Sequence, residues 1–393
     1  MARPDVVEAG YGGIADAPIL GFRSPSIDVV RGLLALWVLC AHLFAWSSAL
    51  NQGNGVLTAI FEWLGRLFQS NGETHPAVLG FIVLSGYCIH RTGFRRRGGS
   101  RIGSYATRRF FRIWPVYLLA TLVGVTLFFA AHFANPQTAS SLSGTARISA
   151  GCVLAKLSGA SVFRPSLHLC SFQGNAPLTT AMVEEWLYIL YAVAFHVVLL
   201  RGGEKPFWLA VVVAWMGGLV YTSAHPEHLA WWHNGSLIGF LPYWWVGAAF
   251  LGEGVRGRVA RLRYPLMVAW GGLTLVLLAG RVESLFVVEA RKAILACLFG
   301  LGIAALDSAG APGWFRPGAL VGRAGYSLYA FHAPLLVLTL TLGAPWWLAG
   351  ATTIAVSLAI YVLYEKPLTD LGKRLAQMVG MAGSPGSQPL PSA

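Results

Sequence analysis

Long apolar runs that are almost free of charge recur along most of the chain. Four clear examples cover residues 116–131, 187–200, 207–220 and 267–280. A helix that crosses a lipid bilayer needs about 20 mostly apolar residues. The pattern therefore predicts a polytopic membrane protein, an all-α bundle of transmembrane helices.

We expect about ten spans in one membrane domain, residues 26–370. The expected spans cover residues 27–48, 75–93, 113–134, 180–200, 206–223, 236–253, 264–281, 291–308, 321–341 and 345–364. Residues 1–25 and the tail 371–393 are expected to be largely disordered and cytoplasmic. The connection at 135–179 is unusually long and is expected outside, where long loops often serve function.

Composition and charge support this class and set an orientation. Apolar residues make up 55% of the chain and charged residues 11%, whereas a soluble domain carries about a quarter charged residues. The formal net charge is +13, but excess Lys and Arg in a membrane protein mainly reports orientation rather than nucleic-acid binding. With the N-terminus inside, about three quarters of the 29 Lys and Arg residues fall on the cytoplasmic side. We therefore expect both ends in the cytoplasm, a first span retained without cleavage, and no nucleic-acid partner.

The five cysteines fall into two groups. Cys40, Cys88 and Cys297 lie in apolar spans and are expected to be small buried apolar side chains. Cys152 and Cys170 lie in the long external connection, where an oxidising exterior allows them to pair. Spacing alone leaves the disulfide open, because it does not show whether the geometry fits.

The first span carries ionisable residues at a regular spacing. Asp28 and Arg31 are three residues apart and can pair on one helix face. Arg31 and His42 are eleven residues apart, which places them within about 20° of the same face and about 16 Å apart along the axis. His42 then lies near mid-membrane, where an ionisable group normally faces a bundle interior or a wet cavity. A histidine merely bonded to a neighbouring helix is the alternative.

A basic stretch precedes and enters the third span. It contains residues 95–97, Arg101, and the pair Arg109 and Arg112, which share a helix face at the inner boundary. Guanidinium groups grip phosphates with two parallel hydrogen bonds, so the pair is a candidate to hold a phosphorylated cytoplasmic ligand. Residues 95–97 are explained by their role in orienting the chain in the membrane and by attraction to anionic lipid headgroups. The same explanation remains an alternative for Arg109 and Arg112.

Two glutamates open the fourth span. The side chains of Glu184 and Glu185 point about 100° apart, so one can face a cavity while the other meets solvent, although stabilisation by the helix N-terminus is the simpler explanation. His332 is a further intramembrane histidine, which we expect to bond to a neighbour. No His or Cys cluster has a spacing that specifies a metal site, so we expect no metal.

Five segments in order resemble the acyltransferase 3 family of membrane O-acyltransferases, over about residues 24–370. The segments are Asp28, Arg31 and His42; Phe-Ile-Val-Leu-Ser-Gly at 81–86; Arg109 and Arg112; Val-Glu-Glu at 183–185; and 326–334, which contains Tyr-Ser-Leu-Tyr and His-x-Pro. Residues 179–182 and Trp186 depart from the family pattern around the glutamates, which leaves open which of the two acts.

The resemblance implies transfer of an acyl group, usually acetyl, from cytoplasmic acyl-coenzyme A to a hydroxyl at or beyond the outer face. The acceptor would be a cell-surface or exported glycan, and the enzyme would lie in the bacterial cytoplasmic (inner) membrane. Arg31, Arg109 and Arg112 would bind the phosphates of coenzyme A. His42 would deprotonate the acceptor hydroxyl or carry the acyl group itself, and one of the two glutamates would orient the acceptor or His42.

A proton-coupled transporter or flippase of a glycan or lipid-linked substrate is the alternative function. Ten spans and intramembrane ionisable residues suit both functions. A transporter more often shows an internal repeat and helices broken at matching positions of two halves. We see neither in the sequence, and the alignment of Arg31 with His42 favours the enzyme.

Overall fold

The structure is a computed structural model, and its described residues form helices with no strand among them. The described residues are 24–52, 54–69, 73–94, 102–143, 149–167, 175–194, 204–250, 252–280, 284–310 and 316–382. Residues 95–97, Arg101 and most of the expected N-terminal tail lie outside them. The all-α prediction is confirmed for the part of the chain that is described.

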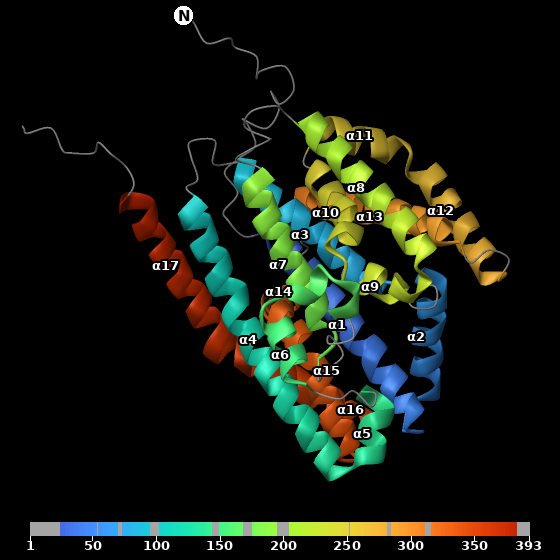
Figure 1. The fold of residues 1–393 in the computed structure, drawn as a ribbon, viewed down its shortest axis with the longest axis vertical. Helices are drawn as coiled ribbons and strands as arrows, with labels where there is room; N and C mark the ends of the chain where they lie inside the picture. The colour runs from blue at the N-terminus through green and yellow to red at the C-terminus, as the bar shows by residue number, and fades with distance from the viewer. Residues whose placement is uncertain are drawn as a thin grey trace, which may run out of the picture.

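The helices follow one another with short connections (Figure 1). The first part of the chain contains α1 (Pro25–Ala49), α2 (Gly55–Phe68), α3 (Pro76–Phe94), α4 (Ile102–Ala134), α5 (Pro136–Ser143), α6 (Ala150–Leu157), η1 (Ala160–Val162), α7 (Leu178–Ala194) and α8 (Glu204–Ala224). The second part contains η4 (Pro226–His228), α9 (Leu229–Asn234), α10 (Leu237–Ala249), α11 (Glu253–Arg261), α12 (Arg263–Leu278), α13 (Leu285–Ala309), α14 (Arg316–Arg323), α15 (Gly325–Thr341), α16 (Trp346–Ile360), η6 (Tyr361–Glu365) and α17 (Lys366–Ala382).

Every expected span coincides with a helix, in the order α1, α3, α4, α7, α8, α10, α12, α13, α15 and α16. Among the described residues, four helical stretches are long and apolar enough to cross a membrane: Pro25–Ala49, Ile102–Ala134, Pro206–Ala224 and Trp346–Val379. One sharply bent pair of helices, Pro226–Ala249 with Glu253–Arg261, would make a fifth. The other helices do not meet that test, so the count of ten spans and the cytoplasmic placement of both ends stay predictions.

Glycines let α3 and α10 cross in close contact. A Cβ at Gly86 would overlap the carbonyl oxygen of Trp244, and a Cβ at Gly247 would overlap the carbonyl oxygen of Val83. Small residues at such crossings allow the backbones of membrane helices to approach each other. The glycine that ends the segment 81–86 is therefore required by packing.

Gly86→Ala is expected to destabilise the protein by about 1–3 kcal/mol, because one added methyl group forces two backbones apart. Gly217→Ala is the matched control, since nothing lies within 4 Å of a Cβ built at that helical glycine. Alanine there should be neutral or stabilise by about 0.5–1 kcal/mol. Thermal unfolding in detergent measures both, and equal midpoints for the two variants would contradict the close crossing.

A second close crossing fixes the start of α1. A Cβ at Gly322 of α14 would overlap the carbonyl oxygen of Asp28, and Gly32 lies directly against the backbone of Gly318 and Gly322. The two α14 glycines are four residues apart and form a small-residue stripe of the kind that brings membrane helices together. The turn of α1 that carries Asp28 and Arg31 is therefore held in place by α14.

The connection at 135–179 is more ordered than a free loop where it is described. It contains α5, α6 and η1, and α6 lies against the flank of α4 (Figure 1). Nζ of Lys156 donates to the carbonyl of Asn175 at 2.6 Å, and the hydroxyl of Tyr117 donates to the carbonyl of Lys156 at 2.5 Å. The amide of Asn175 donates to the carbonyl of Ala330 in α15 at 2.6 Å. The connection thus packs back into the bundle.

A buried polar network surrounds Glu289 in the first turns of α13. Glu289 accepts a hydrogen bond from Nε1 of Trp232 at 3.1 Å and from Nζ of Lys292 at 2.8 Å. The hydroxyl of Tyr243 also donates to this carboxylate, and Nδ1 of His233 lies 3.4 Å from it. All five side chains are buried. The network therefore joins α9, α10 and α13 without direct contact with water.

A second buried pair lies beside this network. Arg291 of α13 pairs with Glu73, which precedes α3, and both side chains are 1% exposed. The expected span at 291–308 placed Arg291 and Lys292 at its very start. Both lie inside α13, which begins at Leu285, and each has an acidic partner: Glu73 from a distant segment for Arg291, and Glu289 of the same helix for Lys292.

Two other expectations differ from the structure in detail. The tail was expected to be disordered from residue 371, but α17 continues to Ala382 because it packs on the first half of α4 (Figure 1). Ser104 of α4 donates to the carbonyl of Ala376 at 2.7 Å. The expected ninth span begins inside α14, and Ala324 separates α14 from α15.

The cysteines follow the two expected groups as far as they are described. Cys152 of α6 is in a disulfide, and its expected partner, Cys170, lies outside the described residues. Cys40, Cys88 and Cys297 are half-buried thiols in α1, α3 and α13.

Candidate active site

Three arginines from two helices meet beside the start of α1. Arg31 lies in the second turn of α1, whereas Arg109 and Arg112 lie one turn apart on α4. Arg112 lies close enough to Arg31 and Arg109 to feel their charges directly. The three side chains are half-buried. Because like charges repel strongly away from bulk water, the cluster calls for anionic partners.

Arg31 and Arg109 have partners within the protein, and Arg112 differs from them. Nη1 of Arg31 lies 2.9 Å from Oδ1 of Asp28. The guanidinium carbon of Arg109 lies 4.5 Å from the ring centre of Tyr188 and 5.8 Å from that of Tyr105. Arg112 makes no hydrogen bond or ion pair with any residue in the described ranges. Its guanidinium is therefore the group best placed to receive a phosphate.

Glu184 lies on the arginine side of the site. The hydroxyl of Tyr188, one turn further along α7, donates to its carboxylate. The charge of Glu184 acts on both Arg31 and Arg109. Glu184 therefore balances part of the positive charge of the cluster.

Glu185 is more buried than Glu184 but also lies near Arg109. Its side chain accepts the indole N–H of Trp114 at 3.0 Å, and its second carboxylate oxygen has no partner within the described part of the chain. No described contact joins either glutamate to His42. The sequence placed the pair at the outer end of the span as orienting groups for the acceptor or His42. Their surroundings in the structure are those of the arginines.

Ser85 explains the polar end of the segment 81–86. Its hydroxyl donates to the Tyr188 hydroxyl at 2.8 Å and accepts the indole N–H of Trp244 at 3.3 Å. The resulting chain of hydrogen bonds runs from α10 through Ser85 and Tyr188 to Glu184. It fixes the aromatic ring on which Arg109 rests.

Glu365 is a member of the site that sequence reasoning missed. It is buried in η6, a single π-helical turn between α16 and α17, and it accepts hydrogen bonds from the Ser327 hydroxyl at 2.5 Å and the Ser327 N–H at 3.2 Å. Its charge acts on Arg112 and Arg31. Single π turns are frequent at functional sites. In the sequence, the position of Glu365 as an acid at the end of an otherwise apolar stretch was the signal that could have pointed to it.

His42 meets a second histidine, His332 of α15. The ring centres are 5.1 Å apart. Nδ1 of His42 lies 3.0 Å from the carbonyl of Val38, and Nδ1 of His332 lies 2.7 Å from the carbonyl of Tyr329. A carbonyl only accepts, so Nδ1 carries the proton in each ring and Nε2 of the neutral ring keeps a lone pair.

The two Nε2 atoms are therefore available for chemistry. His332 is buried, and its Nε2 has no hydrogen-bond partner in the described chain. His42 is half-buried, and Trp46 packs beside it with ring centres 5.0 Å apart. His332 was expected to bond to a neighbouring helix. Instead it bonds to its own helix and leaves its second nitrogen facing the interior.

The arginine cluster and the histidine pair lie along the same helix, α15. A Cβ at Gly325 would lie 3.1 Å from the Arg31 side chain, and His332, two turns further on, meets His42. Arg31 and His42 therefore both face α15, as their spacing predicts. Between them, Tyr329 lies 5.7 Å from His332, measured between ring centres, and feels the charge of Glu184.

Comparison with protein families identifies the family of this chain. A family model described as an acyltransferase domain, that of acyltransferase 3, matches residues 24–365 of the 393. The chain belongs to the acyltransferase 3 family. Comparison with curated proteins and with solved structures gives no significant match.

Membership defines the class of this acyltransferase 3 protein. Together with the apolar helices, it identifies an integral membrane protein of the acyltransferase class. The match begins at Ser24, just before α1, and ends at Glu365. It therefore covers the arginine cluster, both glutamates of α7, the two histidines and the acid of η6.

Proposed function

We propose that this protein moves an acyl group, acetyl in the simplest case, from cytoplasmic acyl-coenzyme A to a hydroxyl of a cell-surface or exported glycan. The bacterial cytoplasmic membrane is the proposed location. The observation that carries the proposal is the convergence of Arg31, Arg109 and Arg112 at one end of the α1–α15 face that leads to His42. The phosphates of a coenzyme A donor can bind at the arginine end, and His42 at the other end can accept a proton.

The proposed roles of the residues follow from their positions. Arg112 and its two neighbours would bind the donor phosphates, and Glu184 would keep the empty cluster from excessive positive charge. Nε2 of His42 would take the proton of the acceptor hydroxyl as the new oxygen–carbonyl bond forms and the carbon–sulfur bond of the thioester breaks. The proton then passes to the leaving thiolate. A route in which His42 first carries the acyl group uses the same nitrogen.

Incubation of the purified protein with radiolabelled acetyl-coenzyme A and candidate glycans tests this function. Label on a glycan hydroxyl is the expected result. Coupled movement of an unmodified glycan across vesicles, without label transfer, would support the transporter alternative and overturn the proposal.

Arg112→Ala is expected to weaken acetyl-coenzyme A binding by about 10- to 100-fold, the worth of one charge-assisted hydrogen bond in a shielded site. Titration calorimetry on the detergent-purified protein measures the dissociation constant. Arg108→Ala is the matched control, because Arg108 lies on the same helix but hydrogen-bonds to Ser104 at 2.9 Å. The control variant should bind as the unmodified protein does. An equal dissociation constant for the two variants would mean that Arg112 only helps to orient the helix in the membrane.

A further inference from the structure

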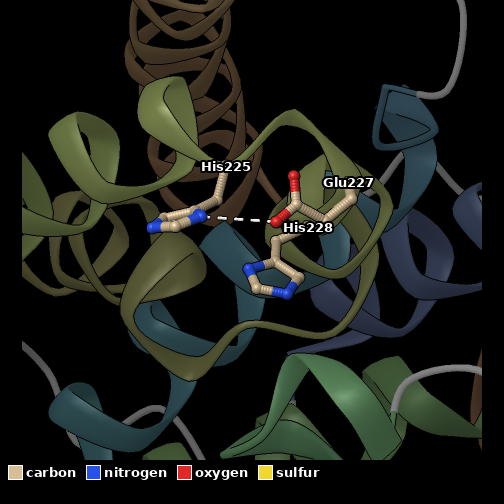
Figure 2. Close-up of side chains that lie close together, drawn as sticks. All are labelled: His225, Glu227 and His228. Carbon is tan, nitrogen blue, oxygen red and sulfur yellow. Dashed lines mark hydrogen bonds and ion pairs between the residues drawn. The ribbon is translucent and has the colours of Figure 1, made fainter.

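A compact group of metal-ligand side chains lies far from the arginine cluster along the chain, in the turn between α8 and α9. It consists of His225, Glu227 and His228 (Figure 2). One ligand atom from each residue lies within 4.8 Å of the other two. The side chains of His225 and Glu227 are 47% and 61% exposed, and His228 is half-buried. An ion from solution therefore has access to them.

The local backbone holds the three residues together. His225 directly follows α8, where its N–H donates to the carbonyl of Thr222 at 3.2 Å, and Pro226 opens the short helix η4. The N–H of His228 donates to the carbonyl of His225 at 2.9 Å, which closes the turn. Three potential ligands in four residues are thereby placed on one side of a single turn. Sequence reasoning missed them because their spacing alone specifies no site.

Tyr221 supports both imidazole rings from the last turn of α8. Its ring centre is 4.6 Å from that of His225 and 5.6 Å from that of His228, to which it is nearly parallel at 16°. Its hydroxyl lies 3.0 Å from Nδ1 of His228. Contacts of this kind orient histidine ligands around metal ions.

One measured separation matches that between two ligands of a small transition-metal ion. Nδ1 of His225 lies 3.3 Å from Oε1 of Glu227 (Figure 2). Two ligands of a tetrahedral zinc ion with bonds of 2.0–2.1 Å are separated by about the same distance, roughly 3.3 Å. A glutamate carboxylate is charged at neutral pH, so Glu227 can bind a cation.

We propose that His225, Glu227 and His228 form a binding site for a divalent transition-metal ion of the zinc class, completed by water. Two imidazoles and one carboxylate favour such ions over Mg²⁺ and Ca²⁺, which take oxygen ligands. An exposed His–Glu pair by itself contributes little, so the ion supplies the main link across the turn. The bound ion stiffens the α8–α9 connection, which leads directly to Trp232 and His233 of the buried network.

The test is zinc titration of the full-length, chelator-treated protein in detergent, purified without a histidine tag. We expect one equivalent of Zn²⁺ to bind and millimolar Ca²⁺ to leave the isotherm unchanged. His225→Ala and His228→Ala should each weaken binding by at least about 10-fold, since even second-shell partners of metal ligands are worth 10- to 100-fold. Hydrogen exchange across residues 221–233 should slow when Zn²⁺ is added to the unmodified protein and remain unchanged in the variants.

His132→Ala is the matched control, because this half-buried histidine at the end of α4 bonds to the carbonyl of Phe128 at 2.9 Å and belongs to no group of three or more potential metal ligands in the described chain. It should leave zinc binding intact. Zinc affinity that survives both turn variants, or falls equally in the control, would mean an adventitious ion only. Displacement by millimolar Ca²⁺ would equally overturn the assignment to a zinc-class ion.

Discussion

His42→Ala is expected to lower acyl transfer by about 10²- to 10⁴-fold, the usual contribution of a positioned general base. The protein should still fold and bind acetyl-coenzyme A, because the arginine cluster lies about 16 Å away along α1. Nδ1 of His42 is committed to the Val38 carbonyl, so alanine removes the one nitrogen available for proton transfer. The measurement is label transfer at saturating donor, together with the donor dissociation constant.

Two comparisons make this result specific. His132→Ala removes a histidine that bonds to its own helix in the same way but lies at the far end of α4, and it should retain full activity. His332→Gln keeps polarity beside His42 while removing the second imidazole, and it should lower transfer less than His42→Ala does. Unchanged transfer in His42→Ala would remove His42 from the mechanism.

Glu289→Ala is expected to destabilise the protein by about 3–5 kcal/mol, the usual cost of removing one partner of a buried ion pair. The substitution leaves the ammonium of Lys292 buried without its carboxylate. It also removes the acceptor for Trp232 and Tyr243. Chemical unfolding in detergent measures the loss, and donor binding by the remaining folded fraction should be normal because the arginine cluster is elsewhere.

An exposed pair provides the control for Glu289. Glu62 of α2 lies 3.9 Å from Arg66, and the two side chains are 55% and 73% exposed. Glu62→Ala should cost no more than about 1 kcal/mol, since water already screens this pair. If Glu289→Ala were as mild as Glu62→Ala, the buried network would not be a major source of stability.

The sequence predicts the positions of the long helices well, because apolar runs are a local property of the chain. It predicts α13 only in part. Arg291 and Lys292 end the apolar run, and nothing local shows that Glu73, 218 residues away, satisfies Arg291. A search for long apolar runs also does not find α2 and α9, because α9 is short and α2 is strongly amphipathic.

The candidate site shows the same difference between what local sequence predicts and what depends on distant contacts. The eleven-residue spacing of Arg31 and His42 is fixed by helix geometry, so their common face could be predicted. The neighbours of each residue depend on how α1, α4, α7 and α15 pack. The sequence therefore did not show that Glu184 would lie beside the arginines, and for Glu365 it offered only the position of an acid at the end of an apolar stretch.

The packing of α17 along the first half of α4 has a consequence for synthesis. Arg109 and Arg112 leave the ribosome early, whereas the segment that braces their helix, Lys366–Ala382, is among the last to be made. The nascent chain therefore carries α4 without the contacts of α17 until translation is nearly finished. A truncated chain that inserts all its apolar runs would still lack α17, so the proposed donor site would be supported on this side only once synthesis of the final helix is complete.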